Sequence, residues 1–80
     1  MQQRFTSPSQ VGHVLASRRK ALQLSQHAVA EKMGISQNRL SELELDPARL
    51  TLDRLIALSN LLGLELVIRD KDTTVTGSDW

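Results

Sequence analysis

Apolar residues recur along most of the chain with the spacing of amphipathic helices, and capping residues divide them into four segments. Ser7-Pro8 followed by Gln10 is typical of a helix start and predicts a first helix over about residues 8–22. Three further segments each begin after a capping hydroxyl, which is supplied by Ser25, Ser36 and Thr51. Gly34 follows the second segment, where glycine accepts the left-handed conformation that ends a helix. The pattern therefore predicts four helices.

The hydrophobic period changes after the fourth helix. Over residues 64–69, Leu64, Leu66 and Ile68 alternate with Glu65, Val67 and Arg69. This alternation, together with β-branched residues, predicts a single strand. Nothing else in the sequence resembles a partner strand, so we expect the strand to pair with the same strand of a second copy. The expected dimer contacts are Leu64, Leu66, Val67 and Ile68. The alternative is an extended segment that lies on the helices of its own chain.

The length of 80 residues allows one small hydrophobic core. We expect a mainly α fold, a small bundle of four to five helices with one C-terminal strand that pairs across a dimer. Residues 1–6 should form an N-terminal arm, residues 7–69 the folded domain and residues 70–80 a polar, flexible tail.

The charged residues are distributed unevenly, although the net charge of the whole chain is +1. Residues 1–40 hold six basic residues and one acidic residue, a net charge of +5. Residues 41–80 hold four basic and eight acidic residues, a net charge of −4. A basic first half suits contact with phosphate groups, and an acidic second half suits a basic partner. Ordinary solvated charge on helix faces is the alternative.

The composition argues against several functional classes. The chain has no cysteine and two isolated histidines, so we expect no metal site and no cofactor. It has no nucleophile paired with a base, no glycine-rich phosphate loop and no carboxylate pair, so we expect no enzymatic activity. No segment has the length of apolar sequence that spans a membrane, and the start lacks the apolar run of a signal peptide. We therefore expect a cytoplasmic protein without a membrane partner.

Residues 24–44, LSQHAVAEKMGISQNRLSELE, place two short helices on either side of a tight glycine turn. Ala30 is small where the two helices would cross, Gly34 makes the turn, and Ile35 and Leu40 anchor the pair to the core. An ordinary pair of packed helices requires neither a small residue nor a glycine at these positions, so their presence favours the more specific motif. The segment therefore predicts a helix-turn-helix, in which the second helix enters the major groove of DNA.

This segment resembles the helix-turn-helix of the lambda-repressor-like (Cro/C1, XRE) family, in which five helices are usual. The resemblance implies that Gln26 contacts a phosphate and braces Gln37. Gln37 would open the recognition helix and bind adenine, because a glutamine amide can donate to N7 and accept from N6 of that base.

Residues around the two glutamines extend the expected DNA contact. Base-edge contacts are expected from Gln37, Asn38, Arg39 and Ser41. Phosphate or bracing contacts are expected from Gln26, Ser36, Arg18, Arg19 and Lys32. Arg39 could reach either a guanine edge or a phosphate. The alternative for the basic run at the end of the first helix is a favourable interaction with the helix dipole.

The order of elements along the whole chain is similar to that of the HipB-type antitoxins of bacterial toxin–antitoxin modules. The resemblance implies a homodimer that binds operator DNA, represses its own operon and neutralises a HipA-like serine/threonine kinase toxin. It also implies that Trp80 reaches a pocket on the toxin, and that the protein lies in the bacterial cytoplasm at the nucleoid. Tryptophan at the end of a polar tail has a strong preference for protein interfaces.

Two other functions remain open at this point. One is a stand-alone transcriptional repressor that has no toxin partner. The other is a module that binds only protein and keeps the helix-turn-helix as a scaffold. The polar side chains of Gln37, Asn38 and Ser41 argue against the second of these, because a mere scaffold does not need a groove-compatible face.

Overall fold

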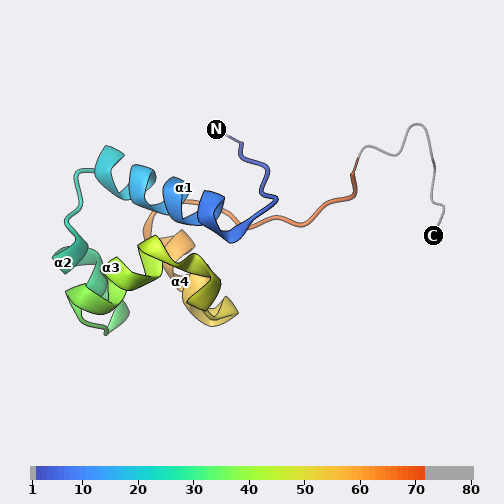
Figure 1. The fold of residues 1–80 in the computed structure, drawn as a ribbon. Coiled ribbons are helices and arrows are strands. Elements are labelled where there is room, and N and C mark those ends of the chain that lie inside the picture. Colours follow the sequence, from blue (N-terminus) through green and yellow to red (C-terminus); the bar gives the residue numbers. More distant parts are fainter. Residues whose placement is uncertain (1, 72–80) are drawn as a thin grey trace.

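The computed structural model describes residues 2–71 and contains four α-helices and a short 3-10 turn. The elements are α1 (Pro8–Ala21), α2 (Gln26–Met33), α3 (Gln37–Leu45), η1 (Pro47–Arg49) and α4 (Leu52–Leu61). In Figure 1, α1 runs along the top of the helical body, and the three other helices lie beneath it. The predicted mainly α fold with four helices is confirmed.

The helices begin where the sequence places capping residues. Ser25 accepts a hydrogen bond from the backbone N–H three residues later at 3.0 Å, Ser36 does the same at 3.0 Å and Thr51 at 3.2 Å. At the start of α1, the side-chain oxygen of Gln10 accepts the backbone N–H of Ser7 at 3.2 Å. Each of these bonds satisfies a backbone donor that would otherwise have no partner at the helix start.

Left-handed residues end two of the helical segments. Gly34 has φ +73° at the end of α2, as predicted, and Gly63 has φ +69° just after α4. Gln23, which follows α1, also has a positive φ of +60°. This conformation is unfavourable for a side chain with a Cβ atom, so the turn between α1 and α2 carries local strain.

The core lies between the four helices. Its buried members are Leu15, Val29, Ala30, Leu40, Leu58 and Leu62. Burying each leucine contributes roughly 1.5–3 kcal/mol, and the small side chain of Ala30 lets α2 approach its neighbours closely. Gly12 faces the carbonyl of Glu44 and the ring of Pro47 with no room for a Cβ atom. The backbone of α1 therefore lies directly against the end of α3.

The predicted strand over residues 64–69 is absent: within residues 2–71 no segment forms a strand. Leu64 packs against the core, but the exposed fraction then rises to 46% at Leu66, 67% at Val67 and 100% at Ile68. A strand requires a neighbouring backbone to satisfy its hydrogen bonds, and the described part of this chain offers none. Figure 1 shows this segment and the N-terminal arm both leaving the body near the start of α1. Most of the expected tail, including Trp80, lies outside the described residues.

Candidate nucleic-acid interface

Helices α2 and α3 are joined by three residues that fix their relative orientation. Gly34 reverses the chain in its left-handed conformation, and the backbone N–H of Ile35 bonds to the carbonyl of Ala30 at 3.0 Å. The side chain of Ile35 packs against the core, and Ser36 then caps α3. The geometry is that of a helix-turn-helix whose second helix is held by its buried face.

The four predicted base-reading residues all lie in the first half of α3. Gln37 and Asn38 are its first two residues, and both are exposed. Arg39 and Ser41 are partly buried. A guanidinium nitrogen of Arg39 lies 3.6 Å from a carboxylate oxygen of Glu42, and the two side chains are 40% and 59% exposed. Such an exposed pair is weak, so Arg39 can exchange this partner for another at little cost.

A buried polar network lies at the C-terminal end of this helix, and it corrects the role predicted for Arg19. Arg19 is 8% exposed, and its Nε lies 2.8 Å from Oε2 of Glu44 while its Nη2 donates to Oε1 at 3.2 Å. Its Nη1 donates to the carbonyl of Leu24 at 3.0 Å. The guanidinium therefore joins the end of α1, the turn before α2 and the end of α3. It is turned into the protein and cannot reach a phosphate.

The network also changes the predicted role of Gln26. Its Nε2 donates to Oε1 of Glu44 at 2.9 Å, and in the described chain no hydrogen bond joins it to Gln37. Gln26 therefore does not brace Gln37 directly. It holds the C-terminal end of α3 through Glu44. Arg18 is only partly buried, and its Nε donates to the carbonyl of Leu62 at 2.8 Å.

Glu44 is the functional residue that sequence reasoning missed. It lies on the same face of α3 as Leu40 and Leu43, because residues three and four positions after Leu40 share its face of the helix. Arg19 follows Leu15 on α1 at the same four-residue spacing. Two opposite charges in apolar stripes were the available signal, since charged residues are rarely buried unless they are paired.

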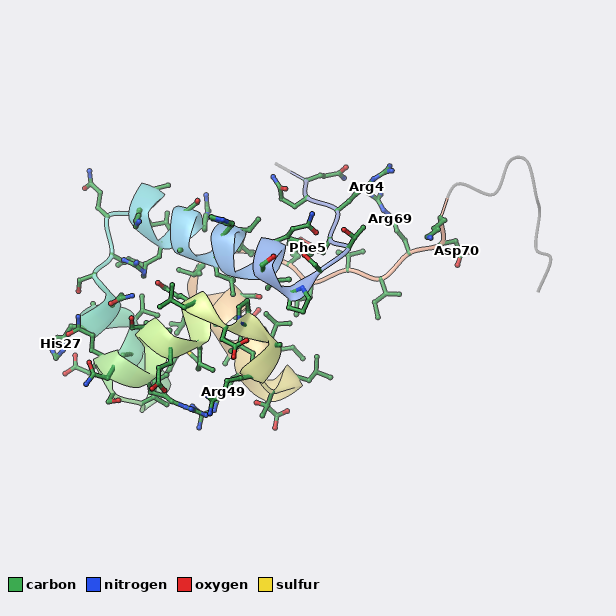
Figure 2. The ribbon with its side chains drawn as sticks, viewed as in Figure 1. Arg4, Phe5, His27, Arg49, Arg69 and Asp70 are labelled. Atoms are coloured by element: carbon green, nitrogen blue, oxygen red, sulfur yellow. The ribbon has the colours of Figure 1, made fainter. Side chains whose placement is uncertain are left out.

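Further polar and positive side chains are exposed on α2, in the turn before α3 and in η1 after it. Ser36 and Lys32 are exposed on either side of the turn that leads into it. Figure 2 shows His27 on the outer side of α2 and Arg49 below α3, and both side chains are exposed. Arg49, which the sequence analysis did not assign to the DNA contact, adds a positive charge to this side of the molecule.

These features define a class of protein. Helix α3 is capped at its start, follows a glycine turn and exposes amide side chains, and cations lie on the neighbouring elements. Such a helix fits the major groove of DNA and the phosphates beside it. A family model described as helix-turn-helix matches residues 15–68, and the chain belongs to this family of Cro/C1-type (XRE) proteins. It is therefore a sequence-specific DNA-binding regulator of transcription.

Two further observations accompany this assignment. A comparison with curated proteins finds no match to the chain. Among residues 2–71, no group of side chains could hold a metal ion, and no helix there is long and apolar enough to cross a membrane.

Proposed function

We propose that this regulator is a homodimeric repressor that reads a twofold operator with the first half of α3. The base-reading residues are Gln37, Asn38, Arg39 and Ser41. The observation that carries the proposal is the contrast along α3. Gln37 and Asn38 are exposed at its start, while Leu40 and Leu43 are completely buried. The helix is thus fixed from behind and presents amide groups to solvent.

The chemistry of these side chains fits base edges in the major groove. The amides of Gln37 and Asn38 can each bind adenine through one donor and one acceptor. Arg39 can form two hydrogen bonds with a guanine once it leaves its weak pair with Glu42. Ser41 lies one turn from Gln37 on the same helix and can reach a neighbouring base.

Phosphate contacts frame the base-reading helix. Ser36 lies at the N-terminus of α3, where the helix dipole and free backbone N–H groups favour an anion. Lys32 lies in the last turn of α2 and supplies a positive charge on the opposite side of the turn. Gln26 contributes by holding α2 against α3 through Glu44. Arg19 is not part of this proposed contact, because its guanidinium nitrogens bond to Glu44 and to the carbonyl of Leu24. Arg18 is only partly buried and uses its Nε alone within the fold, so it remains a proposed phosphate contact at the end of α1.

Dimerisation would come from residues 64–69. The predicted contacts are Leu64, Leu66, Val67 and Ile68, and the last three are exposed in the single chain. Two copies related by a twofold axis would present two α3 helices to successive major grooves on one side of the duplex.

The base-reading proposal is tested by replacing Gln37 with alanine. A duplex is first selected from a random-sequence library with the unaltered protein, and a scrambled duplex serves as the nonspecific probe. Gln37→Ala should cost on the order of 1–3 kcal/mol on the selected duplex and little on the scrambled one. Gln2→Ala, the same change on the exposed N-terminal arm, should leave both affinities unchanged. An equal loss on the two duplexes would mean that Gln37 contacts only the backbone.

A second role, as an antitoxin, is supported by the resemblance of the whole chain to HipB-type antitoxins. In this role the protein represses its own operon and neutralises a HipA-like serine/threonine kinase toxin. Trp80, which lies outside the described residues, would be the residue that binds the toxin. The net charge of −4 over residues 41–80 suits a basic partner surface. The alternative is a stand-alone repressor.

Co-expression with the neighbouring genes of its operon separates these two roles. An antitoxin should co-purify with a kinase in fixed stoichiometry, and Trp80→Ala should weaken that complex while leaving DNA binding intact. A protein that purifies alone and still binds its operator is a stand-alone repressor.

A further inference from the structure

An open apolar cleft is formed by residues of the N-terminal arm, α1, η1 and α4. It has a volume of about 380 Å³, and its apolar wall includes Phe5, Val11, Ala48 and Leu55. None of its lining residues is charged. Figure 2 shows Phe5 near the start of α1, and its side chain is 42% exposed. The volume is within the range of ligand-binding pockets, so the cleft can hold one large side chain.

Two hydroxyl groups also line the cleft, those of Thr6 and Ser7. Thr6 Oγ1 donates to Oε1 of Gln10 at 3.3 Å. A hydroxyl that donates one hydrogen bond can still accept another. The cleft therefore suits a side chain with a large apolar face and a single N–H donor, which is the chemistry of an indole.

The charged residues beside the cleft are mostly positive. Arg4, Arg49 and Arg54 each adjoin a lining residue in the sequence, and Asp46 is the only acidic residue among these described neighbours. The side chains of Arg4 and Arg49 are exposed. An acidic segment is therefore favoured over a basic one as the occupant of the cleft.

One segment of the chain itself has this chemistry. Trp80 is the only tryptophan of the chain, and a tryptophan side chain buries more apolar area than most others. Residues 72–80, which lie outside the described part of the chain, contain Asp72 and Asp79 and no basic residue, so their formal charge is −2. Binding of Trp80 in the cleft would bring Asp79 close to the arginines beside it.

The chain is long enough for Trp80 to reach the cleft. Leu64 packs against the same core as Val11 and Leu55, which line the cleft. Residues 65–71 can carry the chain at most about 24 Å from Leu64, and residues 72–80 can return it by up to about 30 Å. The short tether also gives Trp80 an effective concentration in roughly the millimolar range, at which even a contact made by one side chain is populated.

We propose that Trp80 binds in this cleft of its own chain. Its indole lies against Phe5 and Leu55, and its N–H donates to the hydroxyl of Thr6. Asp79 lies among the arginines beside the cleft. The contact covers the apolar cleft when no partner is bound, and a partner that binds Trp80 must first release it. This inference needs neither the homodimer nor the toxin of the proposed function.

Fluorescence tests this contact directly, because the chain has one tryptophan and no tyrosine. The folded protein should emit at a shorter wavelength than the urea-unfolded chain, and acrylamide should quench it several-fold less. Phe5→Ser removes the aromatic wall of the cleft, and Ala48→Glu adds a negative charge to it. Each variant should shift the emission toward that of the unfolded chain. Leu22→Ser, a matched change of a residue that is 39% exposed just after the other end of α1, should leave the emission unchanged.

Two results of this experiment would overturn the proposal. If the folded wild-type protein and the unfolded chain have the same emission and the same quenching, Trp80 lies in solvent. If the folded protein emits at a shorter wavelength but neither Phe5→Ser nor Ala48→Glu changes that emission, Trp80 lies on another surface.

Refolding two variants together distinguishes a contact within one chain from a contact between two copies. Phe5→Ser keeps Trp80 but lacks the complete cleft, and Trp80→Ala keeps the cleft but lacks the indole. After the two variants are mixed in urea and refolded together, neither chain contains both partners. The emission should therefore stay at the wavelength of Phe5→Ser alone. A shift to the shorter wavelength of the wild-type protein would mean that a second copy fills the cleft, and would overturn the intramolecular contact.

Discussion

The two ends of this protein differ in the kind of side chain that each one buries or exposes. At the C-terminal end of the base-reading helix, the charged side chains of Arg19 and Glu44 are buried and bonded to each other, with exposed fractions of 10% and 9%. Near the start of α1, apolar side chains of the arm and of residues 66–68 are left in solvent. Burial of an ion pair and exposure of apolar groups are both unfavourable unless something compensates them.

The unfavourable burial of charge at one end and the unfavourable exposure of apolar groups at the other are compensated in different ways. This difference indicates the function of each end. The ion pair is compensated inside the chain, because Gln26 and the carbonyl of Leu24 complete its hydrogen bonds. The geometry of α3 is thereby fixed before DNA arrives, which lowers the cost of ordering the interface. The apolar end is not compensated within residues 2–71, so it favours a protein partner.

The largest effect is expected from breaking the ion pair at one residue. Glu44→Ala should lower the free energy of unfolding by about 3–5 kcal/mol, because the guanidinium of Arg19 would remain buried without its partner. Urea denaturation measures this loss. The matched control is Glu42→Ala, which removes an exposed pair with Arg39 and should cost less than about 1 kcal/mol.

Replacement of both partners sharpens this prediction. Arg19→Met with Glu44→Leu should recover much of the lost stability, because apolar side chains of similar volume can replace a buried ion pair. The same double variant should weaken DNA binding, since Gln26 loses its acceptor. A loss below about 1 kcal/mol for Glu44→Ala would mean that the pair does not hold α1 to α3.

Sequence reasoning worked where the controlling interactions are local. Ser25, Ser36 and Thr51 cap helices through bonds that span three residues, and Gly34 supplies its own backbone conformation. Such features depend on neighbouring residues alone, so the four helices and the helix-turn-helix were predictable. The exposed positions of Gln37 and Asn38 followed from the same helical period.

The errors concern partners that are distant in sequence or lie in another chain. Arg19 and Glu44 are 25 residues apart, and the sequence does not state that the end of α1 meets the end of α3. Arg19 was therefore interpreted as a phosphate ligand from its charge. The prediction of a strand over residues 64–69 was wrong for a related reason. Their alternating pattern specifies a strand only when a second backbone lies beside them.

A smaller effect, of the opposite sign, is expected in the turn that the network holds. Gln23 has a positive φ of +60°, and the next residue, Leu24, supplies the carbonyl that accepts from Arg19. Gln23→Gly should raise the free energy of unfolding by about 1 kcal/mol, because glycine adopts this conformation without steric cost. Gln23→Ala keeps the Cβ atom and should give no gain. If the two variants are equally stable in urea, the turn of the wild-type protein is not strained.

The smallest effect on the single chain is expected at the apolar end. Ile68 is fully exposed, so Ile68→Ser should change the stability of dilute monomer by less than about 0.5 kcal/mol. Leu58→Ala, which truncates a buried leucine of α4, should cost about 2–5 kcal/mol under the same conditions.

The dependence of the melting temperature on protein concentration tests whether the apolar end is covered by a second copy. The melting temperature of the wild-type protein should rise with protein concentration because association stabilises the folded state, whereas that of Ile68→Ser should rise less. If the melting temperature of the wild-type protein does not depend on concentration, its exposed apolar residues are not covered by a second copy.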